Sequence, residues 1–154
     1  MRGFSKILIF AFLCGATLTS CGFQSELTND EVIILSNGRT IHLENHQWLK
    51  ELIDLSKADK TGNFWGCIWL ENYKGKDIFV TNMMFGSGGV MYYYFDSSGA
   101  SIINKEYEKY PNPFIESFTG KASFVEVDEG WLNDFRVNMK LNVVVYSSFS
   151  FPCK

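Results

Sequence analysis

The spacing of apolar residues between positions 45 and 62 is helical. Asn45 is a suitable N-cap residue for a helix there, and Asp59 and Gly62 mark its end. Five apolar side chains recur at intervals of three and four positions, which places them on one helix face: Trp48, Leu49, Leu52, Ile53 and Leu55. The pattern predicts one amphipathic helix whose apolar face packs on a core.

Most other apolar segments are short and rich in aromatic and β-branched residues, a composition typical of strands. We expect strands at 32–35, 40–43, 64–73, 77–83, 90–95, 122–127 and 141–148. Asn37 and Gly38 separate the first two strands and can supply the two positive φ values of a type I′ hairpin turn. Residues 92–95 place aromatic side chains on both faces of a strand, so we expect the sheet to be covered on both sides at least in part.

The predicted fold class is α+β: an antiparallel sheet of about six to seven strands with one amphipathic helix packed on it. The segment 105–119 is polar and contains Pro111 and Pro113, which favours a long loop. A short helical turn between Trp131 and Arg136 is a further expectation.

The first twenty residues have the layout of a secretion signal. Arg2 and Lys6 precede an apolar run from Ile7 through Leu13, and small residues follow. The run is too short to span a bilayer, since a spanning helix needs about 20 apolar residues. A permanent transmembrane anchor is therefore the weaker alternative to a cleaved signal peptide.

The residues Leu18-Thr19-Ser20-Cys21 resemble the lipobox of bacterial lipoproteins. The resemblance implies that Cys21 receives a diacylglycerol group, becomes the mature N-terminus after cleavage, and is acylated on its new amine. Gly22 stands where an inner-membrane retention signal would place aspartate, which favours the outer membrane without indicating its side. Ordinary secretion with Cys21 as a thiol is the alternative.

This resemblance divides the chain into three parts. Residues 1–20 are the expected signal peptide, 21–31 the lipidated cysteine with a polar tether, and 32–154 a single α+β domain. Loss of Arg2 and Lys6 leaves 12 basic and 17 acidic side chains in the mature chain, a net charge of -5. That charge disfavours nucleic acid and anionic lipid head groups as partners, because both attract a basic face.

Two cysteines remain after the signal and the lipid site are assigned. After secretion, Cys67 and Cys153 would be in an oxidising compartment, where a pair of cysteines commonly forms a disulfide. Such a bond would close a loop of about 85 residues and contribute roughly 4 to 5 kcal/mol. The alternative is a buried thiol at Cys67 between Trp65 and Trp69, with a free thiol at Cys153.

The segment 48–103 resembles small cell-envelope lipoproteins that carry domains of unknown function. The resemblance covers about a third of the chain and rests on its helix and on the turns at 73–77 and 94–99. It implies no activity.

Several residues could carry chemistry, but each lacks a partner in the sequence. His42 and His46 have no third ligand nearby, so we expect no metal site, and no motif indicates a cofactor. The glycine-rich segment 86–89 precedes a strand rather than a helix, so a hairpin loop is favoured over a phosphate site. Ser87 and Ser98 lack a recognisable base.

Acidic residues allow two further interpretations. A calcium loop would require several oxygen ligands close together, and the segment with Asp128, Glu129, Asn133 and Asp134 provides them. It lacks the ligand spacing of a calcium loop, so turn and capping roles are favoured. Paired carboxylates, at Glu106 with Glu108 or at Asp128 with Glu129, could hydrolyse a glycoside only if they faced each other across a cleft.

Aromatic residues provide the one positive indication of a binding surface. Trp65 and Trp69 would share a face of one strand, and Tyr92 with Tyr94 could extend them into a platform for a sugar or a protein. Core packing accounts for the same four residues and is the favoured alternative.

The leading hypothesis is a non-catalytic envelope lipoprotein that binds an envelope protein or glycan, and an inhibitor or immunity role is a specific version of it. The alternative is a small envelope hydrolase that uses an unrecognised acidic pair. Two carboxylates converging in a deep pocket would favour the enzyme, whereas an exposed aromatic patch would favour binding.

Overall fold

The computed structural model describes residues 31–83, 91–104 and 123–149 of the chain. Within these residues the fold is α+β and contains two sheets. The smaller sheet is a hairpin of β1 (Val32–Ile34) and β2 (Thr40–His42).

The larger sheet has six strands in the order β7-β6-β5-β4-β3-β8. Their bounds are β3 (Cys67–Tyr73), β4 (Lys76–Thr81), β5 (Tyr93–Asp96), β6 (Ser101–Ile103), β7 (Phe124–Glu126) and β8 (Val144–Ser147). The helices are a 3-10 turn (Leu43–Asn45), α1 (Gln47–Ala58) and α3 (Glu129–Asn138).

The predicted α+β class is confirmed, but the sheet differs from the prediction: strand β6 was not expected, and the β1–β2 hairpin forms a separate sheet. β6 and β7 run parallel, so the six-stranded sheet is mixed rather than antiparallel. A parallel pair needs a long crossover connection, and twenty residues separate Ile103 from Phe124 in the sequence. The alternation of side chains has the same period in both kinds of sheet, so it could not reveal the direction of β7.

The first hairpin turns differently from the prediction. Gly38 has a φ of +80°, whereas Asn37 does not have a positive φ. The N–H of Gly38 donates to the carbonyl of Leu35 at 2.9 Å, which gives a three-residue loop instead of a two-residue type I′ turn. Lys74 and Gly75 adopt the two positive φ values, +51° and +79°, in the tight turn between β3 and β4.

The two α-helices differ at their N-termini, and only α3 is capped by a side chain. Asn45 lies in the 3-10 turn, and His46 is the N-cap of α1 without a side-chain hydrogen bond, so the predicted cap is wrong. Asp128 caps α3, because its Oδ1 accepts the N–H of Trp131 at 2.8 Å. α3 has ten residues and extends well beyond the predicted helical turn.

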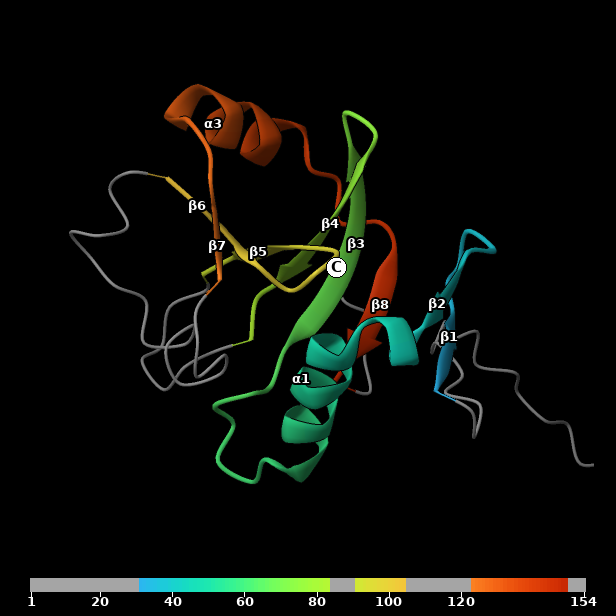
Figure 1. Ribbon diagram of the computed structural model, residues 1–154. Coiled ribbons are helices and arrows are strands. Elements are labelled where there is room, and N and C mark those ends of the chain that lie inside the picture. The colour runs from blue at the N-terminus through green and yellow to red at the C-terminus, as the bar shows by residue number, and fades with distance from the viewer. Residues whose placement is uncertain (1–30, 84–90, 105–122, 150–154) are drawn as a thin grey trace, which may run out of the picture.

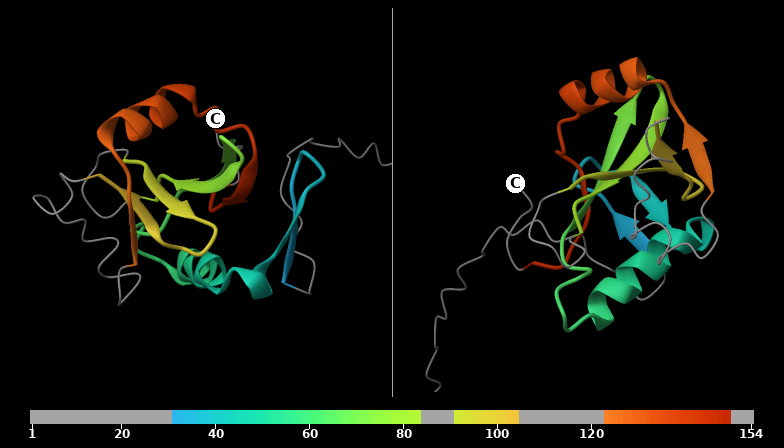
Figure 2. Two further views of the ribbon diagram at one scale, coloured as in Figure 1. Left: turned by 45° about the horizontal axis from the view of Figure 1, so that its top comes forward. Right: turned by 90° about the vertical axis from the view of Figure 1, so that its left-hand side faces the viewer.

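The six-stranded sheet lies between two unequal layers (Figures 1 and 2). α1 and the β1–β2 hairpin cover one face, which we call the α1 face. It buries Leu49, Leu52 and Ile53 of α1, Ile33 and Ile41 of the hairpin, and Ile68, Phe79 and Phe95 of the sheet. α3 covers the other face, called the α3 face, where Leu132 and Phe135 pack on Trp69, Ile78, Val80, Tyr94 and Ile102.

The ends of the sheet are also distinct (Figure 1). α3 and the turn between β3 and β4 lie at the top of the molecule, and we call this the upper end. The turn after α1, the start of β3 and the end of β8 lie at the bottom, and we call this the lower end. In the described part of the chain, no helix is long and apolar enough to cross a membrane.

Candidate functional site

The four residues of the predicted aromatic platform are not brought together on the surface. Trp69 and Tyr94 lie in the core of the α3 face, with only 2% and 6% of their surfaces exposed. Tyr92 is half-buried beside them, with its ring centroid 6.1 Å from that of Trp69. The core alternative therefore accounts for these three residues.

Trp65 lies apart from the other three. It precedes β3, which begins at Cys67, so strand alternation does not align it with Trp69. Between them Gly66 packs so tightly that a Cβ there would lie 2.7 Å from the Cα of Met83. Trp65 is 45% exposed at the lower end, and its indole N–H donates to the carbonyl of Asp59 at 3.1 Å.

A pocket opens at the upper end between α3 and the sheet. Its cavity volume is about 120 Å³. The walls are apolar side chains drawn from β4, β6, β7 and α3, and charged residues lie at its rim. The lining residues are Lys76, Asp77, Ile78, Asp96, Ile102, Val125, Val127 and Trp131.

α3 is held firmly above this pocket. The Trp131 ring meets the ring of Tyr73 edge-on at 5.3 Å and stacks on Phe135 at 5.6 Å. Asp134 accepts hydrogen bonds from the Tyr73 hydroxyl and, at 2.8 Å, from the Lys74 ammonium. These hydrogen bonds lower the pKa of Asp134, with Lys74 as the larger cause. α3 is thus tied to the turn between β3 and β4 by Asp134.

The two carboxylates near the pocket have structural partners. Asp77 accepts a bidentate ion pair from Arg39 at 3.0 and 2.5 Å, and this contact lowers its pKa. Asp96 organises its own turn by accepting the N–H and hydroxyl of Ser98 at 2.9 and 2.6 Å and the N–H of Ala100 at 3.0 Å. Both carboxylates that line the pocket are therefore engaged in hydrogen bonds within the fold.

The other candidates for chemistry are separated. His42 lies 3.9 Å from Glu44, while Nδ1 of His46 lies 2.9 Å from the carbonyl of Ser97. Across the described ranges, no three His, Cys, Asp or Glu side chains are grouped to hold a metal ion. Asp128 is a helix cap, in line with the favoured interpretation, whereas Asp134 is the ion-pair partner of Lys74.

Several predicted sites lie outside the described residues. These are the lipid site Cys21, the signal and tether before residue 31, the glycine segment 86–89 with Ser87, the acidic pair Glu106 and Glu108, the loop 105–119 and Cys153.

The proposed disulfide can be examined at one of its two cysteines. Cys67 is 2% exposed and is paired with Ser147 across β3 and β8, with its Sγ 3.7 Å from the Ser147 Oγ. Cys153 follows Ser147 by six residues, and a chain of that length extends at most about 20 Å. A bond between Cys67 and Cys153 is thus within reach, and it stays a prediction.

Sequence reasoning missed the pocket because its walls carry no distinctive signal. Ile78, Ile102 and Val125 are ordinary strand residues, and only the packing of α3 at one end of the sheet leaves a space between them. Sequence reasoning also could not identify the buried indole N–H of Trp69. Among the described residues it is the only buried side-chain nitrogen or oxygen without a hydrogen-bond partner.

No protein-family model, curated protein or solved structure matches the chain. Function is therefore inferred from the residues of the chain itself.

Proposed function

We propose that the chain is a cell-envelope lipoprotein, anchored in the outer membrane through Cys21, that binds an envelope protein without catalysing a reaction. The observation that carries the binding role is the pocket beneath α3, with its apolar walls and charged rim. The lipobox-like residues Leu18-Thr19-Ser20-Cys21 support the anchor.

The size of the pocket favours a protein side chain as its occupant. Sites for drug-sized ligands have volumes of roughly 300 to 1,000 Å³, whereas an apolar cavity of about 150 Å³ binds benzene. At about 120 Å³ the pocket beneath α3 accommodates one aliphatic or small aromatic group. Such a group matches a single anchor residue of a protein interface better than a sugar ring with its many hydroxyls.

The walls of the pocket suit this kind of anchor. Ile78 and Ile102 form a buried floor, and Trp131 and the 38%-exposed Val125 connect that floor to the surface. An apolar side chain that enters is removed from water on several sides at once, which is how a few residues dominate binding energy at interfaces. The exposed Lys76 at the rim adds a charge that can select among partners.

The hydrolase alternative gains no support from the described carboxylates. Asp77 and Asp96 are the two that approach the pocket, and both are engaged in structural hydrogen bonds. A binding role needs no such pair, so it is the function that this geometry supports best.

The anchor is tested by replacing the acceptor cysteine. Cys21→Ser should abolish incorporation of labelled fatty acid and leave an uncleaved or soluble chain, because the thiol of Cys21 is the proposed acceptor. Cys14→Ser, which changes a cysteine of the expected signal peptide, is the control and should incorporate label normally. Undiminished label in Cys21→Ser would contradict the assignment.

The binding role is tested by filling the pocket. Val125→Phe places a ring at the pocket wall, and Val137→Phe makes the same change on α3 at a side chain that is 83% exposed and away from the pocket lining. We expect the intact lipoprotein to recover one envelope protein in stoichiometric amount. Val125→Phe should weaken that recovery roughly tenfold, the effect of a lost anchor contact, and Val137→Phe should not.

Two results would contradict the binding proposal. One is equal recovery of the partner by both variants, which would separate binding from the pocket. The other is the absence of any stoichiometric protein from the intact lipoprotein. Urea unfolding of both variants serves as the control for folding.

A further inference from the structure

Exposed apolar side chains gather at the lower end of the sheet. Eight large hydrophobic residues of the described chain are exposed, and four of them occur at this end. Leu55 is 41% exposed, Trp65 45%, Met91 61% and Phe149 41%. We call these four residues the lower apolar rim.

Strand register brings the members of the lower apolar rim to one place. Gly66 pairs with Ser148 through an N–H to carbonyl bond of 3.0 Å, so Trp65 and Phe149 are the next residues beyond that pair. Thr81 pairs with both Ile68 and Tyr93, which places Met91 beyond the same end of the sheet.

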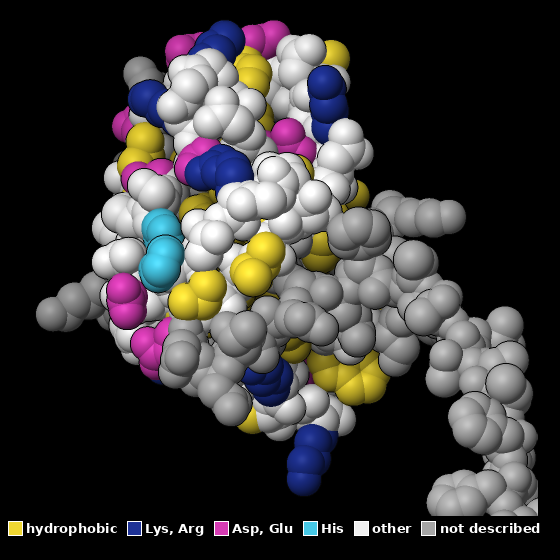
Figure 3. Space-filling view, turned by 90° about the vertical axis from the view of Figure 1, so that its right-hand side faces the viewer, with side chains coloured by type: hydrophobic (Ala, Val, Ile, Leu, Met, Phe, Trp, Pro, Cys, Tyr) yellow, Lys and Arg dark blue, Asp and Glu magenta, His cyan; other side chains and the backbone are white. Residues whose placement is uncertain are grey.

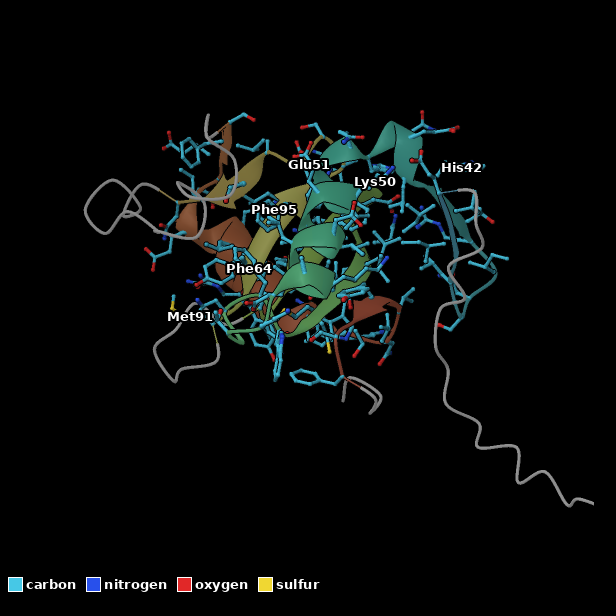
Figure 4. The ribbon with its side chains drawn as sticks, turned by 90° about the horizontal axis from the view of Figure 1, so that it is seen from below. His42, Lys50, Glu51, Phe64, Met91 and Phe95 are labelled. Atoms are coloured by element: carbon cyan, nitrogen blue, oxygen red, sulfur yellow. The ribbon has the colours of Figure 1, made fainter. Side chains whose placement is uncertain are left out.

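The end of α1 completes the rim. The indole of Trp65 is bonded to Asp59, whose own N–H donates to the carbonyl of Leu55 at 2.9 Å. Hydrophobic side chains are visible at the bottom of Figure 3, with basic side chains beside them. In Figure 4, which views the molecule from this end, Met91 and Phe64 lie on the side away from His42.

Trp65 is fixed in its exposed position. The carboxylate of Asp59 accepts the N–H of Phe64 at 2.7 Å and the N–H of Thr61 at 2.8 Å, and these bonds lower the pKa of Asp59. The Asp59 carbonyl takes the indole N–H of Trp65. Because that donor is already paired, the ring can enter an apolar medium without leaving an unsatisfied polar group.

We propose that the lower apolar rim contacts the phospholipid bilayer, an inference that rests on the proposed lipid anchor at Cys21. Ten residues, 22–31, connect Cys21 to β1, and fully extended they reach about 35 Å. The domain is therefore held at the membrane surface, where even a weak apolar contact is favoured by high effective concentration. Tryptophan is enriched at membrane interfaces because its ring is apolar and its edge polar.

The charges around the rim favour a neutral lipid surface as the occupant. Lys57 and Lys60 are exposed there, and Asp54 and Asp59 balance them. The mature chain is acidic overall, so insertion of apolar side chains among zwitterionic head groups is the driving force rather than attraction to anionic lipid. This orientation turns the pocket beneath α3, at the upper end, away from the membrane (Figure 1).

Lipid quenching of tryptophan fluorescence tests the contact. The full mature lipoprotein is reconstituted in phosphatidylcholine vesicles whose acyl chains are brominated near the head group. Bromine quenches only nearby indoles, so we expect quenching in the wild type. It should be lost in Trp65→Phe and retained in the control Trp131→Phe, which removes the tryptophan at the upper end.

The outcomes separate this inference from the anchor on which it rests. Fatty-acid labelling of the same preparation reports whether Cys21 is lipidated. Labelled protein that shows no quenching, or quenching that persists in Trp65→Phe, would overturn the bilayer contact and leave the anchor intact. Absence of label would overturn both.

Discussion

The α1 face of the sheet is packed more closely than the α3 face. The α1 face buries an unbroken apolar cluster that joins α1, the β1–β2 hairpin and four strands, and Leu49, Leu52 and Ile53 are at most 1% exposed. The α3 face has a smaller cluster, a pocket of about 120 Å³ and the unpaired indole N–H of Trp69. Stability is therefore concentrated on one face, and the other retains space for a ligand.

A glycine shows the difference most directly. Gly99 has a φ of +87°, and a Cβ at this position would lie 2.4 Å from the Trp48 ring, so the α1 face has no room for one additional carbon. Val125 on the α3 face borders open space and is 38% exposed. Close packing of this kind is expected of a face that provides folding energy, whereas open space is expected of a face that binds.

The largest effect should come from removing a ring from the α1 face. Phe95→Ala deletes a side chain that is 1% exposed and whose ring centroid lies 5.3 Å from that of Trp48, and we expect a loss of about 3 to 5 kcal/mol in unfolding free energy. Phe135→Ala, the matched deletion on the α3 face, should cost less because α3 can settle into the neighbouring pocket. Urea unfolding measures both, and a larger loss for Phe135→Ala would contradict the comparison.

Adding atoms to each face should give an intermediate effect. Gly99→Ala combines a clash with Trp48 and a strained positive φ, for which we expect a cost of about 2 to 3 kcal/mol. Val125→Phe adds a whole ring at the pocket and should change stability by less than about 1 kcal/mol. Thermal unfolding distinguishes them, and equal losses would mean that the pocket is as closely packed as the α1 face.

The smallest effect concerns the ion pair that joins the β1–β2 hairpin to β4. Arg39 lowers the pKa of Asp77, so the pair stabilises the fold above the unperturbed carboxyl pKa of 3.8 and loses its effect as the pH falls below it. Because both side chains are partly exposed, Asp77→Asn should cost at most about 1 kcal/mol at neutral pH. The difference from wild type should shrink as the pH falls below 3.8 and vanish once Asp77 is protonated in the folded state. A constant difference across this range in urea titrations would contradict an electrostatic cause.

Local pattern was sufficient to predict much of the fold. The apolar spacing in α1 and the composition of β3, β4 and β5 located these elements within a few residues, because their side chains repeat with the period of the structure they form. The direction of β7 and the length of α3 depend on contacts between distant segments. Leu55, assigned to the buried face of α1, is exposed instead, and Ser56 is buried where the Tyr146 hydroxyl reaches it.

The candidate site was less predictable than the fold. Trp65 and Trp69 have the spacing of a strand face, yet the strand begins between them and separates an exposed ring from a buried one. The pocket is formed by strands and a helix from separate parts of the chain, so no short motif could identify it. Asp128 was recognised in its capping role because a cap depends only on neighbouring residues.

The most direct test of the account is to identify what touches each end of the molecule in the intact cell envelope. A photo-crosslinking amino acid is placed at Val125, beside the pocket, or at Trp65, in the lower apolar rim. We expect a single protein adduct from position 125 and lipid adducts from position 65. Lipid adducts from position 125, or the same protein adduct from both positions, would contradict it.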